Sequence, residues 1–467
     1  MAACKKNPTF EEKELQILRN AVDNAEAKAG KKLTQAEETQ KIIKIVENFL
    51  RKKKLVCYGG TAINNILPTE DQFYDKNIEL PDYDFFSHNA LNDAKALADI
   101  YAKNNYSDVE AKSGIHHGTY KVYVNFIPVA DITYIPKDLF NSISKESVKV
   151  AGILYAPPNY LRMAMYLELS RPQGDVSRWE KVLKRLILLN KNYPMRNPKC
   201  HHVDFMRSFE NKNKNDMHDI YMTVRDSITD QGLVFFGGYA SSLYSKYMPK
   251  RERKMFHLKS PDFDALSDDP ETSAVIIKER LMDEGFDKVK VFKRPGVGEI
   301  IAPHYEISVD KETVAFIYKP LACHSYNVIR LSGRKVKVAT IDTMLSFYLA
   351  FLYANRPYYD HDRILCMSQY LFSVQARNRL EQKGLLKRFS LNCVGDQDTM
   401  EDIRAEKAAN FEKLKNKRGT KQWDEYFLRY NPTTDKKKNK HKHKTRKRKK
   451  RKKKKKTKKR GLFLWAK

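Results

Sequence analysis

The N-terminal region carries hydrophobic residues at the spacing of α-helices. Within residues 9–50 the apolar positions recur near the helical period. They are Leu15, Ile17, Leu18, Val22, Ile42, Ile43, Ile45, Val46 and Leu50. Gly30 and Lys31 interrupt the pattern between its two halves. We therefore predict an N-terminal helical region, residues 1–50, made of two helices.

Strand-like and helical segments alternate after this region. In KLVCYGG, residues 54–60, a short apolar run ends at two glycines, which indicates a strand entering a tight turn. Residues 119–135 are rich in β-branched and aromatic side chains, as strands are. Residues 175–190 return to the helical period with one apolar face. The cations of the other face are Arg178, Lys181, Lys184 and Arg185. This alternation predicts an α+β fold of mixed β-sheets with packed helices.

The same order of features occurs twice along the chain. A second glycine pair lies at residues 237–238, a second D-x-D pair at residues 262–264 and a second β-rich segment at residues 305–318. Residues 336–349 also overlay residues 148–161 without a gap. The repeat is far longer than those of solenoid proteins. It predicts two tandem copies of one globular fold.

The two copies differ at one acidic position. We assign them to residues 51–195 and 196–430. In the first copy the sequence VAD ends at Asp131, whereas its best match in the second copy is VAF, which ends at Phe316. We therefore predict that the second copy is degenerate.

Positive charge is concentrated at the C-terminus. The 467 residues include 88 Lys and Arg and 57 Asp and Glu, a formal net charge of +31. Residues 436–467 contain 21 of these cations and no acid, so residues 1–435 carry 67 cations against 57 acids, or +10. We predict a disordered Lys/Arg-rich tail, residues 431–467. It fits a polyanionic partner, with nucleic acid favoured over an anionic membrane, or a solvated or targeting segment.

The cysteines and apolar runs exclude other classes. The six cysteines are scattered without a CxxC pair, so we expect neither a disulfide framework nor a structural zinc site. This cysteine usage fits a reducing intracellular compartment. The longest apolar run, residues 344–354, is well short of the ~20 residues that span a bilayer. It predicts a buried helix, and no membrane association is expected.

The D-x-D pair of the first copy predicts a metal site. Asp82 and Asp84 are two residues apart, so on a strand their carboxylates would point the same way. Two neighbouring carboxylates repel each other unless a cation joins them. Hard oxygen ligands suit Mg²⁺ or Mn²⁺. With Asp131 on a neighbouring strand, three carboxylates could hold two metal ions and support in-line nucleotidyl transfer.

The glycine pair predicts the nucleotide-binding part of the same site. Gly59 and Gly60 lack Cβ atoms, so their backbone amides could approach phosphate oxygens closely. Thr61, at the start of the next helix, could add a hydroxyl contact. Lys181 and Lys184, on the cationic helix face, are candidate contacts to the triphosphate or to RNA, although a solvated helix face is the commoner explanation.

Each of these features has an ordinary explanation when it stands alone. A glycine pair is usually a turn, and a D-x-D pair is common on surfaces. Their combination, with Asp82 22 residues after Gly60 and a third acid on a β-rich segment, is much more specific. It favours nucleotidyl transfer.

These motifs resemble the DNA polymerase β-like nucleotidyltransferase superfamily. More narrowly, the chain resembles the poly(A) polymerase catalytic subunit of large cytoplasmic DNA viruses, of the poxvirus and giant-virus type. The narrower resemblance depends on CYGGTAINNILP, LPDYDFFS, VADITYIP and ELSRPQGDVSRWEKVLKRL, and on the duplicated layout. It extends over roughly residues 10–395.

The resemblance implies roles for individual residues. Asp82, Asp84 and Asp131 would be catalytic metal ligands, and Gly59 and Gly60 would bind phosphate. The implied fold is two tandem nucleotidyltransferase-like domains. The implied reaction is template-independent addition of AMP from ATP to RNA 3′ ends, with two Mg²⁺ or Mn²⁺ ions.

The resemblance also suggests partners and a location. The poxvirus enzyme works with a separate processivity subunit, so this chain could need such a partner, form a homodimer or hold RNA through its own tail. The implied location is the cytoplasm of an infected cell, in the viral factory, with packaging in the virion as a further option.

Two other functions remain open on the sequence. One is another RNA-terminal nucleotidyltransferase that adds oligo(A), CCA or U. The other is a non-catalytic RNA-binding scaffold, which the three acids of the first copy argue against.

Overall fold

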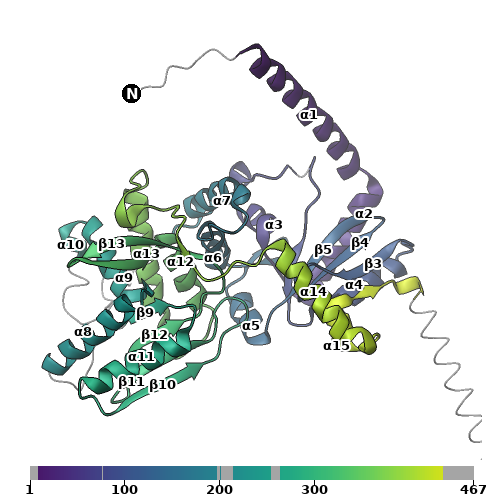
Figure 1. The fold of residues 1–467 in the computed structure, drawn as a ribbon. Helices are drawn as coiled ribbons and strands as arrows, with labels where there is room; N and C mark the ends of the chain where they lie inside the picture. Colours follow the sequence, from purple (N-terminus) through teal and green to yellow (C-terminus); the bar gives the residue numbers. More distant parts are fainter. Residues whose placement is uncertain (1–8, 76, 197–199, 201–213, 254–262, 435–467) are drawn as a thin grey trace, which may run out of the picture.

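Two mixed eight-stranded sheets with packed helices make up the protein (Figure 1). The computed structural model describes residues 9–75, 77–196, 200, 214–253 and 263–434. The predicted α+β fold is confirmed at this level. The tail from residue 436 onward and Asp262 of the second acid pair lie outside the described residues.

The sheets have the following strand orders. The first consists of β16 (Arg429–Tyr430), β3 (Val109–Ser113), β4 (Thr119–Val124), β5 (Ile127–Tyr134), β2 (Asp84–Ser87), β1 (Val56–Cys57), β7 (Ile153–Tyr155) and β6 (Val148–Val150). The second consists of β10 (Val289–Arg294), β11 (His304–Val309), β12 (Glu312–Tyr318), β9 (Phe263–Leu266), β8 (Val234–Phe236), β14 (Arg334–Ala339), β13 (His324–Leu331) and β15 (Cys393–Val394).

Seven strands of one sheet match seven of the other in order and direction. β1 runs antiparallel to β2 and parallel to β7, and β8 has the same relations to β9 and β14. β2 pairs in parallel with β5, as β9 does with β12. Only the edge strands β16 and β15 have no counterpart among the described residues. The two halves therefore share one topology.

This match corrects one sequence alignment. Lys337 of β14 pairs with Val234 as Leu154 of β7 pairs with Val56, so Lys337 corresponds to Leu154. The gapless overlay of residues 336–349 on residues 148–161 places Lys337 on residue 149 and is therefore wrong by five residues. The sequence VKVA therefore occurs in two strands, β6 and β14, that do not occupy equivalent positions in their sheets.

The helices of the first half surround its sheet or project from it. They are α1 (Phe10–Thr34), α2 (Glu37–Lys53), α3 (Gly59–Ile66), α4 (Ala90–Lys103), α5 (Lys137–Lys145), α6 (Pro158–Leu169) and α7 (Trp179–Asn192). Two N-terminal helices are found as predicted, but the break follows Thr34, and Gly30 lies inside α1. Most of α1 is exposed and extends away from the body (Figure 1).

The second half has its own helices and a returning C-terminal segment. They are α8 (Lys214–Asp230), α9 (Gly237–Tyr244), α10 (Lys250–Arg253), α11 (Pro270–Asp283), α12 (Ile341–Phe351), α13 (His361–Arg377), α14 (Met400–Leu414) and α15 (Lys421–Phe427). After β15 the chain passes through α14 and α15 and adds β16 to the edge of the first sheet. The predicted second domain, residues 196–430, includes this returning segment.

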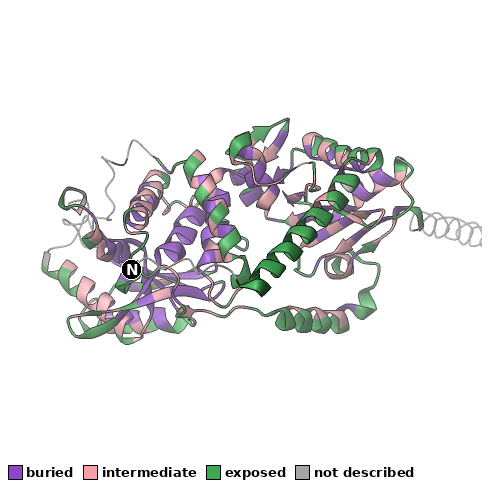
Figure 2. Ribbon diagram, turned by 90° about the horizontal axis from the view of Figure 1, so that it is seen from above, coloured by how far each residue is buried: buried purple, intermediate pink, exposed green. Residues whose placement is uncertain are grey.

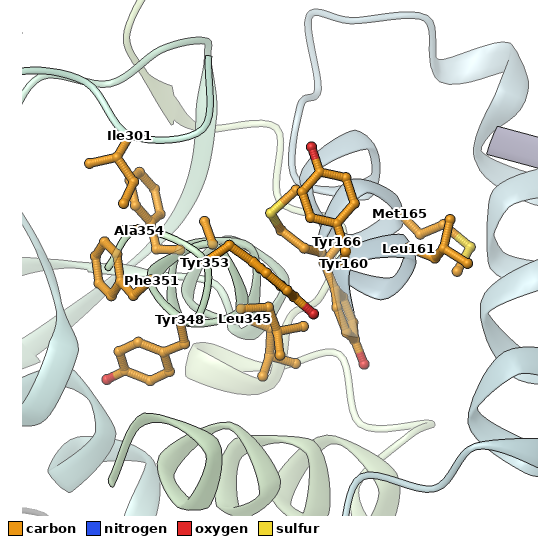
Figure 3. Close-up of a cluster of buried hydrophobic side chains, with 14 of the residues drawn as sticks. Tyr160, Leu161, Met165, Tyr166, Ile301, Leu345, Tyr348, Phe351, Tyr353 and Ala354 are labelled. Carbon is orange, nitrogen blue, oxygen red and sulfur yellow. The ribbon is translucent and has the colours of Figure 1, made fainter. Parts of the chain in front are cut away.

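The two halves meet through α6 and α12. Every residue of α12 is buried, which confirms the buried helix predicted from its apolar run. Figure 3 shows aromatic and aliphatic side chains around this contact, where the ring centroids of Tyr160 in α6 and Tyr353, just after α12, are 5.3 Å apart. Figure 2 shows buried residues in the strands of both sheets and exposed residues along the outer helices.

The structure contains two disulfide bonds, so the prediction of no disulfide framework is wrong. Cys200 is bonded to Cys366 and Cys323 to Cys393, across 166 and 70 residues of sequence. The fold brings these cysteines together from distant segments, which no local spacing could indicate. Of the cysteines that the structure describes, Cys57 is the free one, and it is buried.

No helix in the described part of the chain is long and apolar enough to cross a membrane.

Candidate active site

The glycine pair follows a short central strand. The apolar run forms β1, and α3 begins at Gly59, whose φ of +74° favours glycine. A Cβ atom on Gly59 would lie 2.7 Å from Oδ2 of Asp84. Glycine at this position therefore lets the helix start in contact with the carboxylate. The first amides of α3 have no acceptor inside the helix and are available to an anion.

The fold brings the predicted acids together. Asp84 begins β2 and pairs in register with Asp131 on the parallel strand β5. Asp82 lies two residues before Asp84 and is exposed, while Tyr83 between them is buried. The amide of Asp131 donates a hydrogen bond of 3.0 Å to the carbonyl of Tyr83. Alternation along the extended backbone thus directs Asp82 and Asp84 to the side occupied by Asp131.

Burial and neighbouring acids raise the pKa of Asp84 and of Asp82. Burial, followed by the charges of Asp82 and Asp131, raises the pKa of Asp84 to about 7. Burial and the charge of Asp131 raise the pKa of Asp82. The site therefore concentrates more negative charge than the protein itself neutralises, which is the electrostatic condition for binding cations.

A lysine already contacts one of the acids. Lys121 of β4 pairs with Asp131 across the sheet, and its ammonium forms an ion pair with the Asp131 carboxylate. Within the described residues, no three His, Cys, Asp or Glu side chains form a group that could hold a metal ion. The fold therefore brings the three acids near one another, but in this structure their side chains do not form a ready-made set of metal ligands. Lys121 could not be identified from the sequence, because cross-strand register decides which residue it pairs with.

Thr61 has a role inside the protein. Its buried hydroxyl donates a hydrogen bond of 2.7 Å to the carbonyl of Asp82. This bond ties the start of α3 to the loop that carries the first acid. The hydroxyl hydrogen is therefore already used, and Thr61 positions Asp82.

The two predicted lysines are exposed, and an arginine of the same helix approaches the glycine pair. Lys181 and Lys184 are exposed, and Lys184 Nζ forms a surface ion pair of 2.6 Å with Glu180. Arg185 instead donates a 2.6 Å hydrogen bond to the Tyr74 hydroxyl. A Cβ atom on Gly60 would lie 2.5 Å from that hydroxyl and 2.9 Å from Nη1 of Arg185.

Arg178 supplies a second cation near the acids. Its positive charge opposes the rise in the pKa of Asp84, and its guanidinium lies 3.1 Å from a carboxylate oxygen of Glu168. Arg178 and Arg185 are seven residues apart, two helical turns, so they share a face. Lys181 is spaced to lie on the same face, so the sequence alone could not separate the arginines from the lysines.

The equivalent place in the second half is closed. Gly237 begins α9 with φ +72°, and its Cβ would lie 2.0 Å from Oδ2 of Asp264. Asp264 pairs in register with Phe316, just as Asp84 pairs with Asp131. Only a cavity of about 30 Å³ remains there, lined by Phe316 and Tyr318 among other side chains.

Comparisons with known proteins find similarity over the segment that contains the site. Residues 44–175, which contain the glycine pair and all three acids, match the family model described as "Poly(A) polymerase catalytic subunit". This match confirms the resemblance to poly(A) polymerase catalytic subunits of large DNA viruses.

Individual relatives come from two kinds of virus. The chain is 35% identical over 173 residues to a putative poly(A) polymerase catalytic subunit of African swine fever virus (strain Badajoz 1971 Vero-adapted). It is 31% identical over 183 residues to a protein of the same description from Acanthamoeba polyphaga mimivirus. These matches span 36% and 38% of this chain and 36% and 31% of those relatives.

A solved structure shows a similar fold. The Megavirus polyadenylate synthase superposes with a TM-score of 0.75 over 93% of this chain and 88% of that chain, at 19% identity.

Proposed function

We propose that this protein is a template-independent poly(A) polymerase that adds AMP from ATP to RNA 3′ ends and releases pyrophosphate. The observation that carries the proposal is the register of Asp84 with Asp131, beside a helix that begins at Gly59. The amides that would bind phosphate lie next to the carboxylates. The relatives named above, over the segment that contains the site, support the same activity.

The residues of the first half divide the work. The amides of Gly59 and Gly60 and the guanidinium of Arg185 would hold the triphosphate at the start of α3. Asp131 would orient the 3′-hydroxyl of the RNA. Thr61 would hold the Asp82 loop in place through its hydrogen bond.

The carboxylates fit divalent metal ions. Asp82, Asp84 and Asp131 would hold the ions, since oxygen ligands with uncompensated negative charge suit Mg²⁺ or Mn²⁺. When bound, the ions would neutralise the triphosphate and make the RNA hydroxyl more acidic. Lys121 would have to release Asp131 first, because its ammonium contacts that carboxylate.

The second half would be a degenerate nucleotidyltransferase-like domain. A cavity of about 30 Å³ holds about one water molecule and cannot admit a nucleotide. Phe316 stands where the first half has Asp131. The role of the second half would be structural or RNA-binding.

The proposed location and partners follow from the relatives in large DNA viruses. The protein would act on viral mRNA in the cytoplasm of an infected cell, alone, as a homodimer or with a processivity partner. The Lys/Arg-rich tail would add affinity for RNA.

Primer extension tests the function directly. A labelled single-stranded RNA would be incubated with each NTP separately, in Mg²⁺ and in Mn²⁺, beside the Asp82→Ala protein. Long products with ATP alone, absent from the variant, are expected. Asp82→Ala should lower the rate by at least about 1000-fold, since it removes a ligand of both ions, while RNA affinity stays largely unchanged.

Two results would favour the alternatives. Products with UTP or with mixed nucleotides would indicate another RNA-terminal nucleotidyltransferase. RNA binding without extension under any condition, with or without cell extract from the host, would favour the non-catalytic scaffold.

A further inference from the structure

A row of cations crosses the first sheet and ends at the acids. Arg429 of β16 pairs with Lys112 of β3, Lys112 with Lys121 of β4, and Lys121 with Asp131 of β5. One strand further, Asp131 pairs with Asp84. Directly paired residues point to the same face of a sheet. The five side chains therefore form one continuous row, three cations followed by two acids.

This row lies on the open face of the sheet. The side chains of Lys112 and Lys121 are 39% and 37% exposed, and Arg429 is exposed. Their strand neighbours Ala111 and Val122 point the other way and are buried. At a strand spacing of about 4.8 Å, the four steps from Asp84 to Arg429 span about 19 Å.

The outer end of the row is a hollow with aromatic walls. A cavity of about 500 Å³ there is lined by Lys112, Arg429, Tyr123 and Phe126, together with other residues. Nζ of Lys112 lies 4.1 Å from the centre of the Tyr123 ring, and Phe126 is 88% exposed. Cations beside exposed aromatic rings are the usual surface for single-stranded nucleic acid, in which phosphates meet the charges and bases stack on the rings.

Acids are also present in this hollow. Asp108 and Glu110 line it, and a carboxylate oxygen of Glu110 lies 3.7 Å from Nζ of Lys112. Thr434 lines the same hollow, and the lysine-rich sequence begins two residues later. The row thus runs from the acids toward the segment of highest positive charge in the sequence.

The second sheet supplies an internal comparison. There the corresponding row consists of Phe292, Glu306, Phe316 and Asp264, in the same pairing order. No cation occupies any of these four positions. The cation row is therefore a property of the half that keeps its three acids, and the shared fold does not explain it.

We propose that the row of Arg429, Lys112 and Lys121 is the path along which the phosphates of a single-stranded RNA primer reach Asp131. This inference rests on the proposed function and specifies where its polynucleotide substrate lies. The bases nearest the outer end would stack on Tyr123 and Phe126. The 3′ end would lie beside Lys121, which then passes from the Asp131 carboxylate to an RNA phosphate.

A double variant, Lys112→Ala with Arg429→Ala, tests the path without altering the catalytic residues. A matched control is Lys145→Ala with Lys149→Ala, because Lys149 lies on β6 at the opposite edge of the same sheet. Binding of a labelled single-stranded RNA by the full chain would be followed by anisotropy at several salt concentrations. Two lost phosphate contacts should lower the slope of log affinity against log salt by about 1.4 and weaken binding roughly 10-fold. The control should bind like the unmodified protein.

Crosslinking of the unmodified protein gives a second measurement. RNA carrying a photoreactive uridine a few nucleotides from its 3′ end should crosslink within residues 109–126. Wild-type affinity and salt slope in the double variant, or crosslinks confined to the second half, would overturn the path. Neither measurement requires turnover. The RNA path can therefore be supported even if the protein makes no poly(A), and it can be rejected even if the protein does make poly(A).

Discussion

At the scale of single residues, the strongest constraint in the site is the space at Gly59. Alanine there would have to adopt φ +74° and bring its Cβ to 2.7 Å from Oδ2 of Asp84. The backbone conformation alone costs on the order of 1 kcal/mol, and the contact must move the carboxylate. We expect Gly59→Ala to lower primer extension by at least about 100-fold, because a misplaced catalytic group costs that much.

Gly237 provides the matched control for this substitution. It has the same position, a φ of +72° and a still closer approach to Asp264, but it lies in the closed half. Gly237→Ala should lower the melting temperature at least as much as Gly59→Ala while extension continues. Equal losses of activity in the two variants would show that Gly59 acts only through stability.

Lys121 is the second residue whose substitution separates two roles. Its ammonium competes with any cation for Asp131. We expect Lys121→Met to bind Mn²⁺ several-fold more tightly, measured by electron paramagnetic resonance without nucleotide, because the competing charge is gone. Weaker Mn²⁺ binding in this variant would mean that Lys121 mainly holds Asp131 in position.

At the scale of helices, the N-terminal pair shows that an apolar stripe in the sequence does not always become a buried helix face. Both α1 and α2 have apolar residues at the helical period, but Leu18 and Val22 of α1 are 59% and 46% exposed, whereas Val46 and Leu50 of α2 are fully buried. Deleting residues 1–30 should therefore leave the melting temperature within about 2 °C of the full chain. Val46→Ala should cost roughly 1–3 kcal/mol of unfolding free energy, the usual range for a smaller side chain in a core.

A much lower melting temperature of the truncated chain would contradict the prediction that α1 contributes little to stability. Calorimetry of the truncated chain, the Val46→Ala protein and the unmodified protein would make the comparison. The two variants together test whether α2, and not α1, holds the first half together.

The sequence indicated which short motifs lie near one another in the fold, but it did not indicate their long-range contacts. The glycine pair, Asp82, Asp84 and Asp131 could be found because each follows from a short motif and its spacing. Lys121 could not, because cross-strand register is set by turns and a bulge in the β4–β5 pair. The disulfides join residues far apart in sequence, and the contact of Arg185 with Tyr74 depends on where α7 packs.

At the scale of the whole molecule, the two halves have diverged from one topology into different surfaces. The first keeps three acids and a cation row on an open face. The second fills the equivalent space with aromatic side chains, and α12 buries every residue against α6 and its own half. The two halves pack together through α6 and α12, and the second half keeps its own glycine pair, with a left-handed backbone at Gly237.

The buried core of the second half also makes stability depend on pH. His324 is 2% exposed, both of its ring nitrogens lack a hydrogen-bond partner, and burial with the nearby charge of Arg171 lowers its pKa to about 3. The unfolded chain binds a proton at an ordinary pKa of about 6.5, and the folded chain does not. Stability is therefore complete above pH 6.5 and falls as the pH decreases from 6.5 toward 3, by roughly 2 kcal/mol at pH 5 from this residue.

His324→Leu removes that dependence, since an apolar side chain of similar size binds no proton. Urea unfolding at pH 7, 6 and 5 should show a smaller loss of unfolding free energy in the variant. The difference in slope against pH should correspond to about one proton taken up on unfolding. His116→Leu, in an exposed loop, serves as the control and should retain the full dependence. Parallel pH profiles for His324→Leu and the unmodified protein would mean that His324 is protonated in the folded state, and that the core of the second half admits a charge that its packing shows no means of neutralising.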